Sequence, residues 1–151
     1  MKTLICSISI HHGNTKKVAE AMAGVLHADM MPPNKVTPEL IGQYELVGFG
    51  SGIYFRKHHE SLFKLLDRLP EMQGKKAFLF STAGFSGMKS SFHRPLREKL
   101  TGKGFEIVGE FSCSGWDTYA IFGLFGGIHR GHPDERDLQK AREFAQGLMK
   151  G

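Results

Sequence analysis

Hydroxyl, amide and imidazole side chains gather in one short segment near the start of the chain. Residues 11–15 read His-His-Gly-Asn-Thr. They follow an apolar run at 3–8 and precede 16–27, where apolar side chains recur with the period of one helix face. A turn between a strand and a helix N-terminus binds anions, because free backbone N–H groups and the positive end of the helix dipole face it. The pattern indicates a phosphate-sized anion site, and a plain helix cap from Asn14 or Thr15 is the simpler alternative.

Strand-like and helix-like patterns alternate along the rest of the 151 residues. Apolar runs predict further strands at residues 45–50, 77–80 and 105–111, with a weak one at 28–31. Helical spacing of apolar residues predicts helices at 62–69, at 138–148, and from near Pro95 to Gly102 or Gly104. This alternation predicts an α/β fold of the doubly wound type, a parallel sheet with helices on both faces. No linker or repeat interrupts it, so we expect residues 1–151 to form a single domain.

Each expected strand is followed by a segment rich in glycine, hydroxyl groups and aromatic rings. Beside the first turn, these segments are residues 50–59, 81–87 and 112–119. In a parallel sheet such segments share the edge formed by the carboxyl ends of the strands, where doubly wound proteins bind ligands. Four converging loops with one anion site and several aromatic side chains suit a planar aromatic ligand that carries a phosphate.

These residues resemble the flavodoxins and flavodoxin-like flavoproteins. Gly13-Asn14-Thr15 matches the end of the phosphate-loop signature of that family, and the order of strands, helices and glycine loops is similar over essentially the whole chain. The stretch 116–119, residues 122–127 and the helix after Pro133 look like the C-terminal part of small bacterial and archaeal members. The resemblance implies a five-stranded parallel sheet of order 2-1-3-4-5 and non-covalently bound FMN.

The resemblance also implies which residues hold the cofactor. The first turn would bind the phosphate, Tyr54 and Phe55 would flank the flavin ring, and Gly52 would let the peptide beside flavin N5 reorient. Trp116 has the area to stack on or cover the ring, and Asp117 could accept a hydrogen bond from it. The complete expected cofactor set is Ser9, His11, His12, Gly13, Asn14, Thr15, Ser51, Gly52, Ile53, Tyr54, Phe55, Ser81, Thr82, Ala83, Gly84, Trp116, Asp117 and Tyr119.

The chain departs from the usual flavodoxin pattern in three ways. His11 and His12 stand where phosphate loops of the family usually carry hydroxyl residues. Residues 115–133 form a segment that is not typical of a minimal flavodoxin, and its role is open. The formal net charge of +5 differs from the acidic surface common in the family.

The function expected from these features is electron transfer between redox enzymes by an FMN-bound carrier, in which the protein tunes the flavin and does no chemistry itself. One alternative is a small FMN-dependent NAD(P)H:quinone or flavin oxidoreductase, with a second ligand on the exposed flavin face. A basic nucleic-acid-binding module is a non-flavin alternative that charge alone supports. A receiver domain is excluded because the first strand ends without an acidic pair. No catalytic triad, paired carboxylates or metal-ligand cluster stands out in the sequence.

The basic residues and the cysteines bear on partners and location. Basic side chains in or beside the binding loops would form a positive rim for acidic redox partners or a nicotinamide nucleotide: Arg56, Lys57, His58, His59, His129, Arg130 and His132. Cys6 and Cys113 are isolated, which favours a role as core filler and a reducing compartment. With no signal-peptide pattern and no apolar run of membrane-spanning length, we expect a cytoplasmic protein with no membrane span.

Overall fold

A parallel β-sheet forms the centre of the protein in a computed structural model that describes residues 1–10, 13–83, 89–114 and 133–150. The order of the sheet is β2-β1-β3-β5-β6, and a short strand, β4, pairs antiparallel with the end of β3. The strands are β1 (Thr3–Ser7), β2 (Asp29–Met31), β3 (Leu46–Tyr54), β4 (Lys57–His58), β5 (Lys76–Ala83) and β6 (Glu106–Ser114). When only the five parallel strands are numbered along the chain, leaving out β4, their order is 2-1-3-4-5. The predicted strand order is therefore confirmed, and β4 was not predicted.

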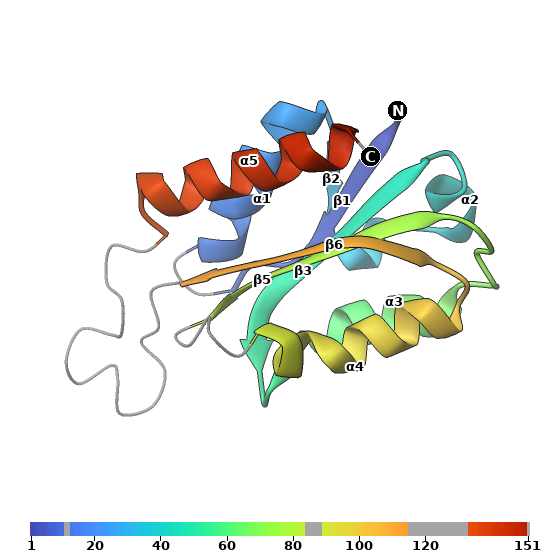
Figure 1. The fold of residues 1–151 in the computed structure, drawn as a ribbon. Coiled ribbons are helices and arrows are strands. Elements are labelled where there is room, and N and C mark those ends of the chain that lie inside the picture. Colours follow the sequence, from blue (N-terminus) through green and yellow to red (C-terminus); the bar gives the residue numbers. More distant parts are fainter. Residues whose placement is uncertain (11–12, 84–88, 115–132, 151) are drawn as a thin grey trace.

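Helices cover both faces of the sheet (Figure 1). On one face lie α1 (Asn14–Leu26) and α5 (Glu135–Lys150), and on the other lie α3 (Glu60–Arg68) and α4 (Lys89–Gly102). A 3-10 turn, η1 (Pro33–Lys35), and the short α2 (Pro38–Ile41) connect β2 to β3. The predicted doubly wound α/β architecture is therefore confirmed.

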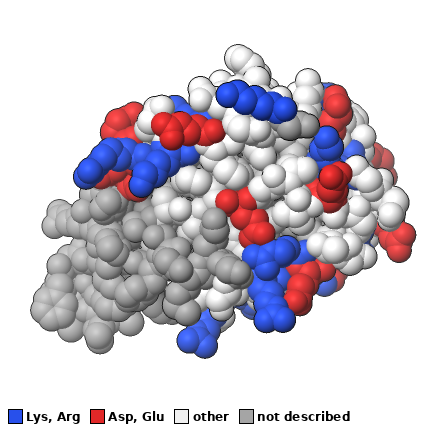
Figure 2. Space-filling model, viewed as in Figure 1, with Lys and Arg blue, Asp and Glu red and all other residues white. Residues whose placement is uncertain are grey.

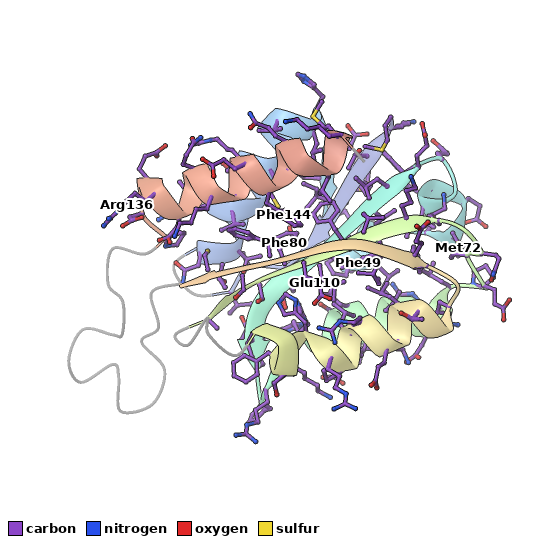
Figure 3. The ribbon with its side chains drawn as sticks, viewed as in Figure 1. Phe49, Met72, Phe80, Glu110, Arg136 and Phe144 are labelled. Carbon is purple, nitrogen blue, oxygen red and sulfur yellow. The ribbon has the colours of Figure 1, made fainter. Side chains whose placement is uncertain are left out.

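Strict alternation along β5 creates a separate apolar core on each face. Ala77 and Leu79 point to the core under α3 and α4, while Phe78 and Phe80 point to the core under α1 and α5. Figure 3 shows Phe80 on the same side of the sheet as Phe144 of α5. Such near-continuous apolar strands are typical of parallel sheets that are buried on both faces.

Three predicted boundaries are wrong, and each has a physical reason. The helix expected to begin near Pro95 begins at Lys89, and Pro95 lies inside it. Burial of Leu96 and Leu100 against the sheet compensates for the backbone hydrogen bond that proline cannot make. Strands β3, β5 and β6 each run three or four residues beyond their predicted ends, because neighbouring strands pair with them there. The expected loop at 50–59 is instead the end of β3 and a hairpin to β4.

Both cysteines are buried and unpaired, as predicted for core filler. Burial raises the pKa of each thiol to about 12, so neither is a thiolate near neutral pH. Among the helices that the structure describes, none has the length and apolarity needed to cross a membrane.

Two glycines of β3 leave room for aromatic rings of β5. A Cβ atom at Gly48 would lie 2.2 Å from Phe78 Cζ, and one at Gly50 would lie 2.1 Å from Phe80 Cζ. The distal carbon atoms of each ring occupy the space where that Cβ atom would lie, and both rings belong to the core beneath α1 and α5. The absence of a side chain at these two positions thus makes room for both rings.

We expect Gly50→Ala to lower the free energy of unfolding by about 1–3 kcal/mol, because the buried Phe80 ring must move. Urea denaturation monitored by circular dichroism measures this change. Gly24→Ala is the matched control, since Gly24 lies within α1 and a Cβ atom there meets nothing within 4 Å. That control should stabilise the protein by about 0.5–1 kcal/mol. An unchanged stability of Gly50→Ala would contradict the packing described here.

Candidate functional site

The N-terminus of α1 opens at the carboxyl edge of the sheet. Gly13, the residue before the helix, has a left-handed conformation with φ 64°, which glycine adopts at little cost. Gly13 has no side chain to cap the helix, and the first turn of α1, all of which the structure describes, contains no acidic residue. The simpler alternative of a cap from Asn14 or Thr15 is therefore wrong, because both lie within the first turn. The positive end of the helix remains available to an anion.

Hydrogen bonds join this turn to the neighbouring strands. Ser9 Oγ accepts a hydrogen bond from the backbone N–H of Lys16, at 3.3 Å. The hydroxyl groups of Thr15 and Thr82 lie 2.9 Å apart and are buried. Residues 67 positions apart in sequence thus meet, and the helix N-terminus is held against the end of β5. The segments predicted to bind the phosphate and the pyrimidine edge are therefore side by side.

The hairpin between β3 and β4 has a strained, exposed tip. Tyr54 pairs with Lys57, so the turn consists of Phe55 and Arg56, with φ angles of 51° and 67°. A left-handed conformation costs a non-glycine residue about 1–2 kcal/mol. The Phe55 side chain is 91% exposed, whereas Tyr54 is half-buried, with its ring edge-on to His59. Of the pair predicted to flank a flavin, only Phe55 extends fully into solvent.

Two other residues predicted on this segment are tied to local structure. The Ser51 hydroxyl donates to the Gly52 carbonyl at 2.6 Å and accepts from the His59 N–H at 2.9 Å. Ile53 pairs with His58 in the hairpin. These bonds fix the backbone of Gly52 in β3, at the end of a central strand.

The prediction that His58 belongs to a positive surface rim is wrong. Its side chain is only 1% exposed, and its Nε2–H donates to the carbonyl of Phe80 at 3.0 Å. Its Nδ1 has no hydrogen-bond partner among the described residues. Burial, followed by the nearby His93, lowers the pKa of His58 to about 3, so the ring is neutral. His59 instead caps α3, with its Nδ1 accepting from the Ser61 N–H.

A chain of hydrogen-bonded polar groups, absent from the sequence prediction, crosses the interior between β5, β6 and α4. Ser81 Oγ lies 2.6 Å from His93 Nε2, and His93 Nδ1 lies 3.0 Å from Glu110 Oε1. The Arg97 guanidinium donates two hydrogen bonds to Glu110, at 2.6 and 2.9 Å. Figure 3 shows Glu110 between the sheet and α4. Burial opposes ionisation of Glu110, but Arg97 and His93 together hold its pKa below the ordinary value.

Serine, histidine and carboxylate in this order have the geometry of a hydrolytic triad, yet the arrangement does not suit hydrolysis. Ser81 is only 1% exposed, so a substrate carbonyl has no access to its hydroxyl group. In addition, Arg97 already forms a bidentate pair with the carboxylate. The cluster can hold or exchange protons without acting as a nucleophile.

Two sequence signals could have revealed part of this cluster. Glu110 is a charged residue in the middle of a strand, between Gly109 and Phe111, and His93 lies four positions before Arg97, on the same helix face. Neither signal indicates a partner without the strand register, which places Ser51, Ser81 and Ser112 in one row across three adjacent strands.

Part of the predicted cofactor set, and part of the predicted rim, lies outside the described residues. These residues are His11, His12, Gly84, Trp116, Asp117, Tyr119, His129, Arg130 and His132. The described members, from Ser9 through Ala83, lie in the segment between β1 and α1, in the first turn of α1, in β3 and the turn that follows it, or in β5.

This architecture defines a doubly wound α/β protein with a ligand edge at the strand ends. A family model of the flavodoxin domain matches residues 5–105, so the chain belongs to the flavodoxin-domain family. An uncharacterized protein of Methanocaldococcus jannaschii is 56% identical over 150 residues, which is 99% of each chain. A flavodoxin from the domain Archaea has a similar fold, with a TM-score of 0.72 and 20% identity over 99% of this chain and 97% of that one. Oxidised flavodoxin 2 from Bacillus cereus has a TM-score of 0.72 and 18% identity over 99% of both chains.

Membership of this family implies a flavin cofactor, and the described residues fit one. A helix N-terminus that follows a glycine and has no acidic residue in its first turn suits the phosphate group. The ends of β3 and β5 supply backbone groups beside it, and Phe55 supplies an exposed aromatic ring.

The buried, neutral His58 predicts a loss of stability in acid. Its pKa is about 3 in the folded protein and about 6.5 when unfolded, so below pH 6.5 the unfolded state binds a proton that the folded state does not. Its contribution to stability is therefore full above 6.5 and falls as pH decreases toward 3. At pH 5 the loss is about 2 kcal/mol.

We expect His58→Gln to remove this component, because glutamine does not titrate and its amide can still donate to Phe80. Urea unfolding of both proteins between pH 7 and pH 4 measures the difference. His27→Gln, at an exposed position after α1, is the control and should keep the wild-type slope. A wild-type slope in His58→Gln would show that His58 is not the group responsible.

Proposed function

We propose that this protein binds FMN non-covalently at the carboxyl edge of its sheet and carries electrons between redox proteins. The observation that carries the proposal is the N-terminus of α1, which begins after Gly13 without an acidic residue in its first turn and is joined through Thr15 and Thr82 to the end of β5. When bound, the flavin would supply the redox chemistry, and the protein would bind and orient it.

The residues at the edge have distinct roles in this proposal. The turn from Ser9 to Thr15 would hold the phosphate, with His11 and His12 as further donors. The segment from Ser81 to Gly84 would offer backbone donors to the pyrimidine edge of the ring. Phe55, Trp116 and Tyr119 would lie against the ring system, and Asp117 would accept from it. Support comes from family membership and from the contact between Thr15 and Thr82, which brings the first two of these segments together.

FMN is favoured over FAD because the chain presents a single phosphate-sized turn and no GxGxxG sequence for a pyrophosphate. We expect the purified protein, reconstituted with flavin, to show a flavin absorption spectrum. Acid release followed by chromatography should yield FMN. Recovery of FAD, or the absence of flavin after reconstitution, would contradict the proposal, while rapid NADH consumption would favour the oxidoreductase alternative.

Substitution of Thr15 tests whether the affinity for FMN depends on the anion site. Thr15→Val removes the hydroxyl group in the first turn of α1, and we expect FMN affinity to fall roughly tenfold or more, as for loss of a hydrogen bond to a charged group. Riboflavin has no phosphate, so its affinity should change much less. Thr101→Val, at an exposed position near the end of α4, is the control. Fluorescence titration of the wild type and both variants with each flavin measures these affinities.

The proposed partners are redox proteins with an acidic docking surface. Arg56 and Lys57 extend from the hairpin tip beside Phe55, and both are exposed. Figure 2 shows positive and negative side chains interspersed over the described part of the face in view, so no single basic patch covers that face. The local positive charge at the hairpin tip therefore suits a protein with a small acidic docking surface better than it suits a nucleic acid.

We expect Arg56→Glu to slow oxidation of the reduced protein by the anion ferricyanide and to speed oxidation by the cation hexaamminecobalt(III). The physical reason is local charge, so both effects should shrink as salt rises. Stopped-flow absorbance measures the rates. Lys150→Glu makes the same charge change at the far end of α5, and it should leave both rates nearly unchanged. Equal effects from the two variants would show that net charge alone matters.

A further inference from the structure

Buried polar groups interrupt the apolar core under α3 and α4 just before the ligand edge. Along β5, Leu79 belongs to that core, and Ser81 is the next residue on the same face. Ser81 is in register with Ser112 of β6 and is bonded to His93 of α4. A titratable ring thus lies one hydrogen bond from the end of the central strand.

The hydrogen bonds allow two proton arrangements with the same heavy-atom positions. When His93 is neutral, its Nδ1–H donates to Glu110 and the Ser81 hydroxyl donates to Nε2. When His93 is protonated, Nε2–H donates to Ser81, and the Ser81 hydroxyl turns to donate to Ser112, 3.3 Å away. Ser81 therefore has a partner in both states.

Among the described residues, the charged and titratable groups facing His93 come from three elements. His58 of β4 has its ring centroid 4.7 Å away, Glu110 comes from β6, and Arg97 comes from α4 itself. From β5 only the Ser81 hydroxyl reaches the ring, and on α3 Asp67 pairs with Lys99, farther along α4.

The charges of these neighbours determine how a nearby negative charge would affect the protonation of His93. Glu110 and Arg97 balance one another, and His58 stays neutral. A proton on His93 therefore gives the cluster one net positive charge. A negative charge arriving at the nearby edge of the sheet would favour that state.

We propose that His93 takes up a proton from solvent when the flavin bound beside the end of β5 is reduced. This inference rests on the proposed function. Two electrons from the donor enter the flavin, and of two protons taken from solvent one goes to the flavin and one to His93. In the protonated state, His93 Nε2–H donates to Ser81 and the Ser81 hydroxyl donates to half-buried Ser112.

His93 is in this view a positioning and proton-holding residue rather than a catalytic one, because it acts through Ser81. A purely structural cluster would keep one protonation state throughout. The state of the ring during reduction therefore distinguishes the two roles.

The experiment uses the wild-type protein loaded with FMN and labelled with ¹⁵N-histidine. Spectra are recorded near pH 7 in the oxidised form and after complete reduction with dithionite. We expect the Nε2 resonance of His93 to move from the region of an acceptor nitrogen to that of a protonated nitrogen. An unmoved resonance in a protein whose flavin is fully reduced would overturn the inference and leave the proposed function intact. Absence of bound flavin would instead overturn the proposed function, and the inference with it.

A second readout is the pH dependence of the two-electron midpoint potential. Each proton taken up with two electrons lowers the potential by about 30 mV per pH unit. We expect the slope of midpoint potential against pH to correspond to two protons in the wild type and to one in His93→Gln, whose amide can still form a hydrogen bond with Ser81. Ser112→Ala removes the acceptor that Ser81 needs when His93 is protonated, so the pH dependence of its midpoint potential should lie between the two. This variant also tests whether the second proton belongs to the His93 cluster if His93→Gln does not fold. His27→Gln is the matched control at an exposed histidine. Identical slopes in all four proteins would overturn the proposal.

Discussion

Parallel pairing of β5 with β3 on one side and β6 on the other is the interaction on which the rest of the structure depends. It places the ends of three strands at one edge and sets the register in which Ser51, Ser81 and Ser112 fall in one row. Because the strands are parallel, the connecting helices must return along the faces of the sheet, and α1 therefore begins at the same edge. The anion site and the polar cluster both follow from this one arrangement.

The residues next to that edge differ between the two faces of the sheet. Under α1 and α5 the core is apolar up to the buried hydroxyl pair of Thr15 and Thr82, which holds a helix N-terminus in place. Under α3 and α4 the apolar core ends earlier, and a bonded row of serine, histidine, glutamate and arginine replaces it. A buried network of this kind is tolerable because nearly all its groups have partners, and it rigidifies the strand end that it surrounds.

The hairpin tip has the opposite character. Its two central residues have left-handed backbones, and its aromatic residue, Phe55, is almost fully exposed. Strain and exposure together are typical of residues that contact something other than their own chain. Here they belong to the residues nearest the flavin edge in the proposed function, on a strand whose other end is fully buried.

The sequence by itself determined the alternation of strands and helices, the two apolar faces and the glycine turn before α1, because periodicity and turn chemistry are local properties. The resemblance it carries also predicted the strand order and the family correctly. Only the tertiary structure decided where strands end beyond their apolar cores, that Pro95 lies within a helix, and that His58 is buried. Strand register and helix packing bring His93, Glu110 and Ser81 together from three separate elements, and no pattern in a single segment specifies contacts of that range.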